Sequence, residues 1–493
     1  MKRRKGRFVS SMSWPLTRKQ LSKIHDATLS VLSKTGLRID CGDFYEPLSA
    51  AGANVDRGSG VVRFPPSLVE ETIEYLRGQI ALGRRQYILN GVTNPRWTPP
   101  MGCKFGGACI EYLDLEANEV RPPTEGDLIG LLQLGEALDG VGFVGNPVTY
   151  LFDSSGRRVP GRLQRIKTAA LVAKYTTKCG STEVWNDQEL ELLLEIGEIV
   201  RGTRAAYEAQ PCFITAKETI APLQFPADDG RVLLMLARRG LPCMVIPMPL
   251  TGATCPCSPA SNIVMCNAEI LGVMAAIHAA VPEAMVSAGV ISGTMDMSTG
   301  AATFSSPEAL LQDAGLAQLY DKVYGQDLGL GTGYIDAKYP GAQSLAEKAM
   351  KMEAAAQQGR FNFPVGLLAG GKRFCPEQAV LELEVAEAIC CLHTGVKVSD
   401  DLLGVDVIDE VGIGKEFLSH EHTLKHFRRT LWAPKIWDRR NPDTLAVEKK
   451  GDMLEAARMK VRDILQRDDL YRIDDDRARA IDEVVARAER DLP

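Results

Sequence analysis

Residues 331–343, GTGYIDAKYPGAQ, place groups that can bind or react where an apolar run gives way to small residues. Tyr334 offers an aromatic ring, Asp336 a carboxylate and Lys338 an ammonium group. Side chains that directly follow a buried strand lie at the edge of the core, where they can reach a ligand. This stretch therefore predicts a substrate pocket at the open end of a barrel.

Other apolar runs end in the same way. Polar, acidic or aromatic side chains follow them at Asn146, Glu183, Trp185, Glu218, Thr251, Asp296, Lys372, Arg373, Asp400 and Asp401. No histidine stands at any of these ends, which argues against hydrolases and proton-transfer enzymes that use a base tuned near neutral pH. No Ser/His/Asp or Cys/His order is recognisable either.

The elements that must position these side chains alternate regularly from about residue 140 onward. Short apolar runs separated by amphipathic helical segments occur at 141–147, 178–185, 211–218, 241–252, 284–296, 328–336, 362–371 and 397–408. Parallel strands buried on both faces show this pattern, since each crossover is a helix. We predict an α/β fold with a (β/α)8 TIM barrel over residues 140–412. A doubly wound open sheet is the alternative, but no phosphate-binding glycine loop follows the first run, and GLGTG (329–333) lacks the full GxGxxG spacing.

The flanks lack this rhythm. In residues 1–139 we expect helices at 18–34 and after the prolines at 65–66, a hairpin at 111–120, and a helix capped by Thr124 with Asp127 three positions on. Residues 413–493 end in charged helical sequence. We predict an N-terminal helical and hairpin extension and a C-terminal helical tail, both packed on the barrel.

Composition narrows the class of protein. The net charge is −6, with 45% apolar and 24% charged residues, which indicates a globular chain without a nucleic-acid partner. The longest apolar region, 270–293, is broken by His278, Pro282 and Glu283, so it predicts a buried helix, a turn and a strand and no membrane span. Twelve cysteines without a CxxC pair, and no secretory or transit pattern, favour reduced thiols and a cytoplasmic location.

The segment HEHTLKH holds the best metal-ligand spacing. His422 and His426 stand at i and i+4, and His420 is nearby. The cluster lies in the tail without an obvious carboxylate and water partner. We expect packing or hydrogen bonding there and predict no metal, although the sequence leaves metal binding open.

Four segments, in order, resemble the trimethylamine methyltransferase (MttB-like) family: PLTGATCPCSPASNIVMCNAEILGVMAAIHAA, GTMDMSTGAATFSSPEALL, YIDAKYPGAQSLAEKAM and SDDLLGVDVIDEVGIGKEFLSHEHTLKHFR. The similarity spans about residues 110 to 465. It implies a (β/α)8 barrel that moves a methyl group from a methylamine or quaternary amine onto the cobalt of a separate corrinoid protein. Cobalamin would then be supplied by a partner protein.

One departure narrows the implied activity. The trimethylamine enzymes of this family carry pyrrolysine in the segment of the sixth predicted strand. In this sequence that segment contains only the standard amino acids. Members without pyrrolysine resemble demethylases of quaternary amines such as glycine betaine, proline betaine or carnitine. A quaternary ammonium leaves as a neutral amine and needs no general acid, and cobalt(I) is itself the nucleophile, so the protein has only to orient a cation in a water-poor cavity.

The resemblance assigns expected roles to the strand-end residues. We assign Tyr334, Asp336 and Asp296 to the catalytic site, and Trp185, Phe304 and Phe363 to cation–π contacts with the substrate. The remaining substrate-binding candidates are Glu183 for the cation and Lys338, Lys372 and Arg373 for a betaine carboxylate. The corrinoid is expected against Thr251, Gly252, Gly370 and Gly371.

Two other readings stay open: a barrel lyase or isomerase that uses the carboxylates as bases, and a cobalamin- or betaine-binding protein without turnover. We also expect a homo-oligomer.

Overall fold

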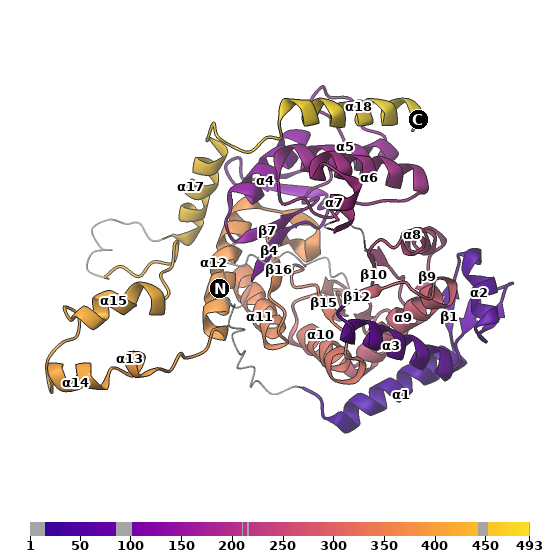
Figure 1. Ribbon diagram of the computed structural model, residues 1–493, viewed down its shortest axis with the longest axis horizontal. Helices are drawn as coiled ribbons and strands as arrows, with labels where there is room; N and C mark the ends of the chain where they lie inside the picture. Colours follow the sequence, from indigo (N-terminus) through magenta and orange to yellow (C-terminus); the bar gives the residue numbers. More distant parts are fainter. Residues whose placement is uncertain (1–14, 85–100, 210, 214–215, 442–451, 493) are drawn as a thin grey trace.

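A computed structural model gives the fold of this protein (Figure 1). It describes residues 15–84, 101–209, 211–213, 216–441 and 452–492. Helices surround short parallel strands whose carboxyl ends meet around one cavity, so the fold is α/β.

The central strands form two parallel sheets, with the orders β16-β4-β7 and β15-β12-β10-β8. Their bounds are β4 (Gly102–Phe105), β7 (Val141–Val144), β8 (Lys217–Glu218), β10 (Cys243–Ile246), β12 (Val286–Val290), β15 (Leu328–Leu330) and β16 (Asn362–Pro364). Cys179 extends the first sheet by a single parallel bridge to Val144, and the Phe213 N–H donates to Gly180 O at 3.1 Å. Among the described residues no bridge joins β15 to β16, so the strands follow the order of a barrel without closing its ladder.

Seven of the eight predicted runs contain a central strand or the Cys179 bridge; the eighth prediction was wrong. Residues 397–408 form α13 (Asp400–Leu403) and enter α14 (Val405–Val411). The Ser399 hydroxyl caps α13, and Gly404, at φ +61°, ends it. The structure instead places β4 among the central strands, although our predicted boundaries put this segment in the N-terminal extension. MGCKF is short and contains a lysine, so a search for long apolar runs passes over it.

The other predicted local elements are confirmed. The helix at 18–34 is α1 (Arg18–Lys34), the proline-started helix is α3 (Pro66–Ala81), and the hairpin is β5 (Glu111–Asp114) with β6 (Glu119–Arg121). Thr124 and Asp127 form the capping box that opens α4 (Glu125–Ala137).

Smaller sheets and connecting elements flank the central strands. Three strands of the N-terminal region form a sheet with β9, in the order β2-β3-β1-β9. Strands β17 and β18 join the β5–β6 hairpin in a second small sheet, and β11-β13-β14 form a third. Their bounds are β1 (Leu37–Ile39), β2 (Asn54–Asp56), β3 (Val61–Arg63), β9 (Gln224–Phe225), β11 (Leu250–Thr251), β13 (Gly293–Met295), β14 (Ala302–Thr303), β17 (Leu367–Leu368) and β18 (Arg373–Phe374). Short helical turns lie at η1 (Gly42–Phe44), η2 (Tyr320–Tyr324) and η3 (Ala369–Gly371).

The remaining helices cover the sheets or extend from them. They are α2 (Tyr45–Ala50), α5 (Gly161–Tyr175), α6 (Asp187–Arg201), α7 (Arg204–Ala209), α8 (Ala227–Arg238), α9 (Pro259–Ala280), α10 (Pro307–Leu319), α11 (Ala342–Gln357), α12 (Pro376–His393), α15 (Glu421–Thr430), α17 (Met453–Leu465) and α18 (Asp475–Asp491). Among the described helices α9 alone has the length and hydropathy of a membrane span, and 72% of its apolar window is buried against the protein. It is therefore the predicted core helix, followed by a turn and β12.

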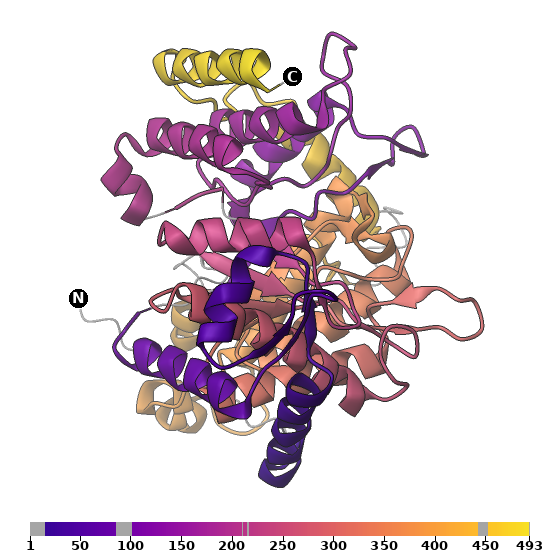
Figure 2. The same ribbon diagram turned by 90° about the vertical axis from the view of Figure 1, so that its right-hand side faces the viewer.

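The C-terminal helices return to the body of the protein. Figures 1 and 2 show α18 lying across α5 and α6, where Arg487 pairs with Glu195. Helix α17 packs on α12 and α4. The tail thus covers helices on the outside of the central sheets.

A buried ion pair bridges the seam between β15 and β16. The Lys348 ammonium of α11 lies 3.3 Å from the Glu382 carboxylate of α12, and both side chains are fully buried. Lys348 also donates to Gly333 O at 2.9 Å, three residues after β15, and to Pro364 O at 3.1 Å, at the last residue of β16. The other Glu382 contacts are from the Gly366 N–H at 2.8 Å and the Gln378 amide at 2.7 Å. These side chains connect the strand ends that the ladder leaves unjoined.

We expect Lys348→Met to lower the free energy of unfolding by about 3–5 kcal/mol, because it leaves the Glu382 charge buried without its partner. Denaturant unfolding measures this, with Lys23→Met on the exposed face of α1 as the matched control. The double variant Lys348→Met/Glu382→Leu should recover part of the loss. A single variant as stable as the control would contradict this role for the pair.

Candidate active site

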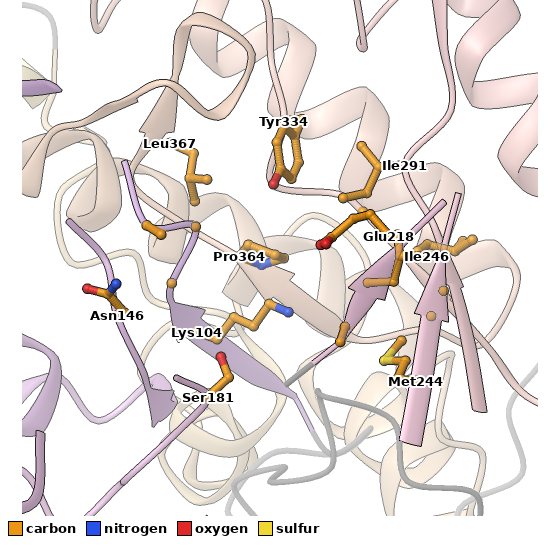
Figure 3. Close-up of a pocket in the computed structure, with 18 of the residues that line it drawn as sticks. Lys104, Asn146, Ser181, Glu218, Met244, Ile246, Ile291, Tyr334, Pro364 and Leu367 are labelled. Atoms are coloured by element: carbon orange, nitrogen blue, oxygen red, sulfur yellow. The ribbon is translucent and has the colours of Figure 1, made fainter. Parts of the chain in front are cut away.

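A cavity of about 200 Å³ lies at the carboxyl ends of the central strands. Every segment of the ring order contributes to its lining: Lys104, Phe143, Ser181, Glu218, Ile246, Val290, Leu330 and Pro364. Figure 3 shows Lys104, Glu218 and Tyr334 pointing into the same space from three separate elements. The volume suits a ligand smaller than most drugs.

Tyr334 lies in this cavity, as the sequence predicted. Burial raises the pKa of its phenol to about 12, so the ring is neutral at physiological pH. Lys351 of α11 donates to Tyr334 O at 2.9 Å and also to Phe304 O. The Phe304 and Tyr334 rings lie 5.8 Å apart at 56°, and Gly371 leaves room for Tyr334, since a Cβ there would approach its Cε1 to 2.3 Å. Tyr334 is therefore held firmly by groups outside the cavity.

Two carboxylates give the cavity a negative side. Glu218 and Glu183 both line it. Glu218 faces the cavity, and its side chain is exposed to the solvent there. Desolvation by the surrounding protein, followed by the nearby Glu183 charge, raises its pKa to about 7. Glu183 accepts from Lys217 at 2.9 Å. Glu218 is therefore the carboxyl group whose charge responds most directly to a cationic ligand.

Lys104 and Asn146 supply the polar groups elsewhere in the lining. Burial lowers the pKa of the Lys104 ammonium to about 8, and the Asn146 Oδ1 atom is buried without a hydrogen-bond partner among the described residues. No histidine or cysteine stands among the described lining residues. The nearby Cys109 thiol donates to Gly371 O, and burial raises its pKa to about 12. The lining thus offers groups that bind charge and no activated thiol or imidazole.

Asp336 and Asp296, which we had assigned to catalysis, lie outside the cavity lining. The Asp336 carboxylate accepts from the Phe304 N–H at 2.8 Å and from the Ser305 N–H and hydroxyl, so it fixes the loop beside Tyr334. Asp296 lies in the exposed β13–β14 turn, where bonds from Ser298 lower its pKa. The structure therefore supports a positioning role for Asp336 and a turn-forming role for Asp296.

The predicted aromatic cage is only partly assembled. Phe363 is fully buried in the core, and Phe304 reaches the cavity only through its contact with Tyr334. The Trp185 ring already has a cation, since Lys217 Nζ lies 4.0 Å from its centroid. Of the predicted aromatic residues, Tyr334 alone lines the described cavity.

The basic residues predicted for a carboxylate are engaged elsewhere. Arg373 binds Glu111 through two nitrogens at 2.9 and 3.0 Å, and Lys372 approaches the same carboxylate at 3.0 Å. Lys338 is exposed and donates to Asp336 O. None of the three lines the cavity, whereas Lys104 does.

The residues predicted to contact the corrinoid also make contacts within the protein. The Thr251 hydroxyl is buried and donates to Gln312 at 2.6 Å, and Gly252, at φ +86°, lies against Met297. Gly370 and Gly371 take positive φ in η3, next to Phe304 and Tyr334. These positions shape the loops around the site.

Sequence reasoning missed Lys104 and gave Glu218 no role. Lys104 was overlooked because β4 was assigned to the extension, although a lysine within the apolar MGCKFGGA was a usable signal. Glu218 was noted at a strand end, but its proximity to Glu183 depends on neighbouring strands.

The histidine cluster makes hydrogen bonds and ion pairs, and the structure adds a carboxylate that the sequence did not show beside it. Asp401, His422 and His426 bring atoms that could bind a metal within 4.8 Å of one another, so the absence of a metal there stays a prediction. His422 Nε2 lies 2.8 Å from Asp401 O, and His426 Nε2 lies 3.3 Å from the Asp401 carboxylate. Lys425 binds that carboxylate at 2.8 Å, and His420 Nδ1 accepts from the His422 N–H. These contacts hold α13 against α15.

Comparison with known proteins identifies the class. A sequence model of the trimethylamine methyltransferase (MTTB) family matches residues 8–493, so the chain belongs to this family and is a methyltransferase. Among its relatives, a trimethylamine methyltransferase MttB of Desulfitobacterium hafniense is 28% identical over 83% of this chain and 81% of its own length. A glycine betaine methyltransferase of the same species is 26% identical over 88% of each chain. The solved monomethylamine methyltransferase of Methanosarcina barkeri aligns with 90% of this chain and 94% of its own at 10% identity, with a TM-score of 0.46.

We expect Glu218→Gln to raise the midpoint of thermal unfolding at pH 8, since it removes a carboxylate whose ionisation the folded state opposes. Folding raises the pKa of the Glu218 carboxyl group from 4.5 to about 7. The contribution of this group to the free energy of unfolding is therefore fully present below pH 4.5 and is lost as the pH rises through 7. The gain should shrink as the pH falls toward 5. Thermal unfolding between pH 5 and 8 measures it, with the exposed Glu119→Gln as control; equal midpoints for both variants at pH 8 would contradict the assignment.

Proposed function

We propose that this protein transfers a methyl group from a quaternary amine of the glycine betaine class to the Co(I) centre of a cognate corrinoid protein. The observation that carries the proposal is the placement of Glu183, Glu218 and Tyr334 in one small cavity that also contains Lys104. Carboxylates and an aromatic face attract a quaternary ammonium, and a lysine binds a carboxylate. The glycine betaine methyltransferase among the relatives supports the same substrate class.

The chain's own residues would bind and orient the substrate. Glu218 and Glu183 balance the ammonium charge, and Tyr334 closes one side of the cavity. Charge on the carboxylates must not hold the cation too tightly, because only interactions that grow toward the transition state speed the transfer. A Glu218 pKa of about 7 fits this requirement, since the group is not fully ionised at neutral pH.

The residues present fit a methyl acceptor supplied from outside. The lining holds no histidine or cysteine among the described residues, and glycines 106, 107, 289, 329 and 331 leave parts of its wall without side chains. A reduced corrinoid supplies the nucleophile for a methyl group, so this protein need not provide one. The tertiary amine leaves neutral, and no proton has to be delivered to it.

The direct test incubates the protein with cob(I)alamin and a panel of quaternary amines and follows formation of methylcobalamin by its visible spectrum. We expect turnover with a betaine and none with trimethylamine. Lys104→Met should raise KM at least tenfold for a betaine and leave a quaternary amine without a carboxylate nearly unchanged, because only the betaine has a group for Lys104 to bind. Solvent deuterium entering a substrate without any corrinoid would support instead the acid–base chemistry of a lyase or isomerase.

Gly371→Ala tests the position of Tyr334 without altering the ring itself. The new Cβ would lie 2.3 Å from Tyr334 Cε1, so the ring must move and the transfer rate should fall at least tenfold, toward that of Tyr334→Ala. Gly359→Ala is the matched control, since φ is +73° there against +83° at Gly371 and no atom lies within 4 Å of its Cβ. Wild-type transfer in both Gly371→Ala and Tyr334→Ala would remove Tyr334 from the site.

A further inference from the structure

Residues 394–434, here called the arm, leave the body of the protein and return to it. Figure 1 shows α13, α14 and α15 projecting away from the sheets and their covering helices. The arm begins after His393 at the end of α12 and ends where the Lys435 N–H donates to Glu384 of the same helix at 2.6 Å. Helices α13 and α15 bury no residue, and α14 buries only Val411.

The arm exposes more apolar surface than a solvated segment should. Ile413 is completely exposed, Leu418 is 76% exposed, and Leu424, Leu431 and Val405 are each at least 60% exposed. Clusters of exposed large apolar side chains mark interaction surfaces. Because the arm points away from its own body, its own chain leaves these side chains exposed.

Two limbs of the arm differ in charge; Lys397 precedes the first, and Lys415, Glu416 and Glu421 lie between them. Between Val398 and Gly412 there are five acidic residues and no lysine or arginine: Asp400, Asp401, Asp406, Asp409 and Glu410. Between His422 and Pro434 the charges are Lys425, Arg428 and Arg429, without an acid. Asp401 and Lys425 pair within the arm, whereas Asp406, Asp409, Arg428 and Arg429 are exposed and have no ion-pair partner among the described residues.

We propose that the arm pairs with the arm of a second copy of this chain, the acidic limb of each lying against the basic limb of the other. A two-fold interface requires a surface complementary to itself, and a segment with one acidic and one basic limb meets this condition. The apolar residues between the limbs then become buried at the centre of the contact. Opposite charges at the rim set the orientation of the pair.

The anchor of the arm favours a second copy over a corrinoid partner docked at the cavity. His393 packs on Phe361 with ring centroids 5.4 Å apart, and Phe361 directly precedes β16. The arm therefore leaves at the amino ends of the strands. The cavity lies at their carboxyl ends, where the methyl acceptor must arrive.

Light scattering after size exclusion, at micromolar concentration, tests the pairing on the full-length protein. We expect the wild type to be a dimer or a larger assembly, and Ile413→Asp/Leu418→Asp to dissociate at a concentration at least tenfold higher than the wild type. Circular dichroism should be unchanged, since neither side chain is buried in its own chain. A monomeric wild type, or a double variant that assembles like the wild type, would overturn the proposal. So would a variant that loses only its binding to the corrinoid protein.

Charge exchange tests the orientation. Asp406→Lys/Asp409→Lys/Glu410→Lys leaves two aspartates against three lysines in the acidic limb, so both limbs become basic, and Arg428→Glu/Arg429→Glu leaves one lysine against two glutamates, so both become acidic. Each variant alone should assemble at least tenfold more weakly. A mixture of the two should recover assembly as a mixed pair, because opposite limbs face each other again. Asp26→Lys/Asp468→Lys/Glu483→Lys, at exposed positions outside the arm, controls for the net-charge change of the lysine variant and should assemble like the wild type. Failure of the mixture to assemble would rule out the limb-to-limb arrangement.

Discussion

The buried pair of Lys348 and Glu382 is the constraint on which the site depends. It lies where the ladder between β15 and β16 is missing, and its hydrogen bonds hold Gly333 and Pro364 in place. Gly333 directly precedes Tyr334, so the same contacts determine where the phenol enters the cavity. Burial raises the pKa of Glu382 and lowers that of Lys348, and the charge of each opposes the shift of the other. A buried pair of this kind is costly to break, which favours a single arrangement of the strand ends.

Charged side chains also lie close together at the cavity, but their charges are balanced less completely than in the Lys348–Glu382 pair. Glu218 is held near Glu183, while Lys217, which partly offsets their charge, is also engaged with Asp229 and the Trp185 ring. This environment opposes the ionised form of Glu218. A cation bound as proposed would relieve that cost. Strongly perturbed groups of this kind concentrate at functional sites.

Several residues predicted to act on the substrate instead position those that line the cavity. Asp336 fixes Phe304 and Ser305, Arg373 binds Glu111, and Thr251 binds Gln312. Their chemical type and their place after a strand were read correctly. Whether such a side chain enters the cavity or turns behind it depends on the path of the following loop, and that path depends on contacts far away in the sequence.

Local periodicity and ordered motifs were enough to predict most of the alternation of strands and helices, the capped helix starts, the buried nature of α9 and the family. The sequence also placed Tyr334 correctly, since a strand end in a glycine-rich segment is a local feature. Only the tertiary structure decided that β4 belongs among the central strands and brings Lys104 to the cavity. It alone decided that 397–408 is helical, that Glu218 lies near Glu183, and that the arm leaves the body. These outcomes depend on pairing between distant segments, where burial and charge are shared by residues that no local pattern connects.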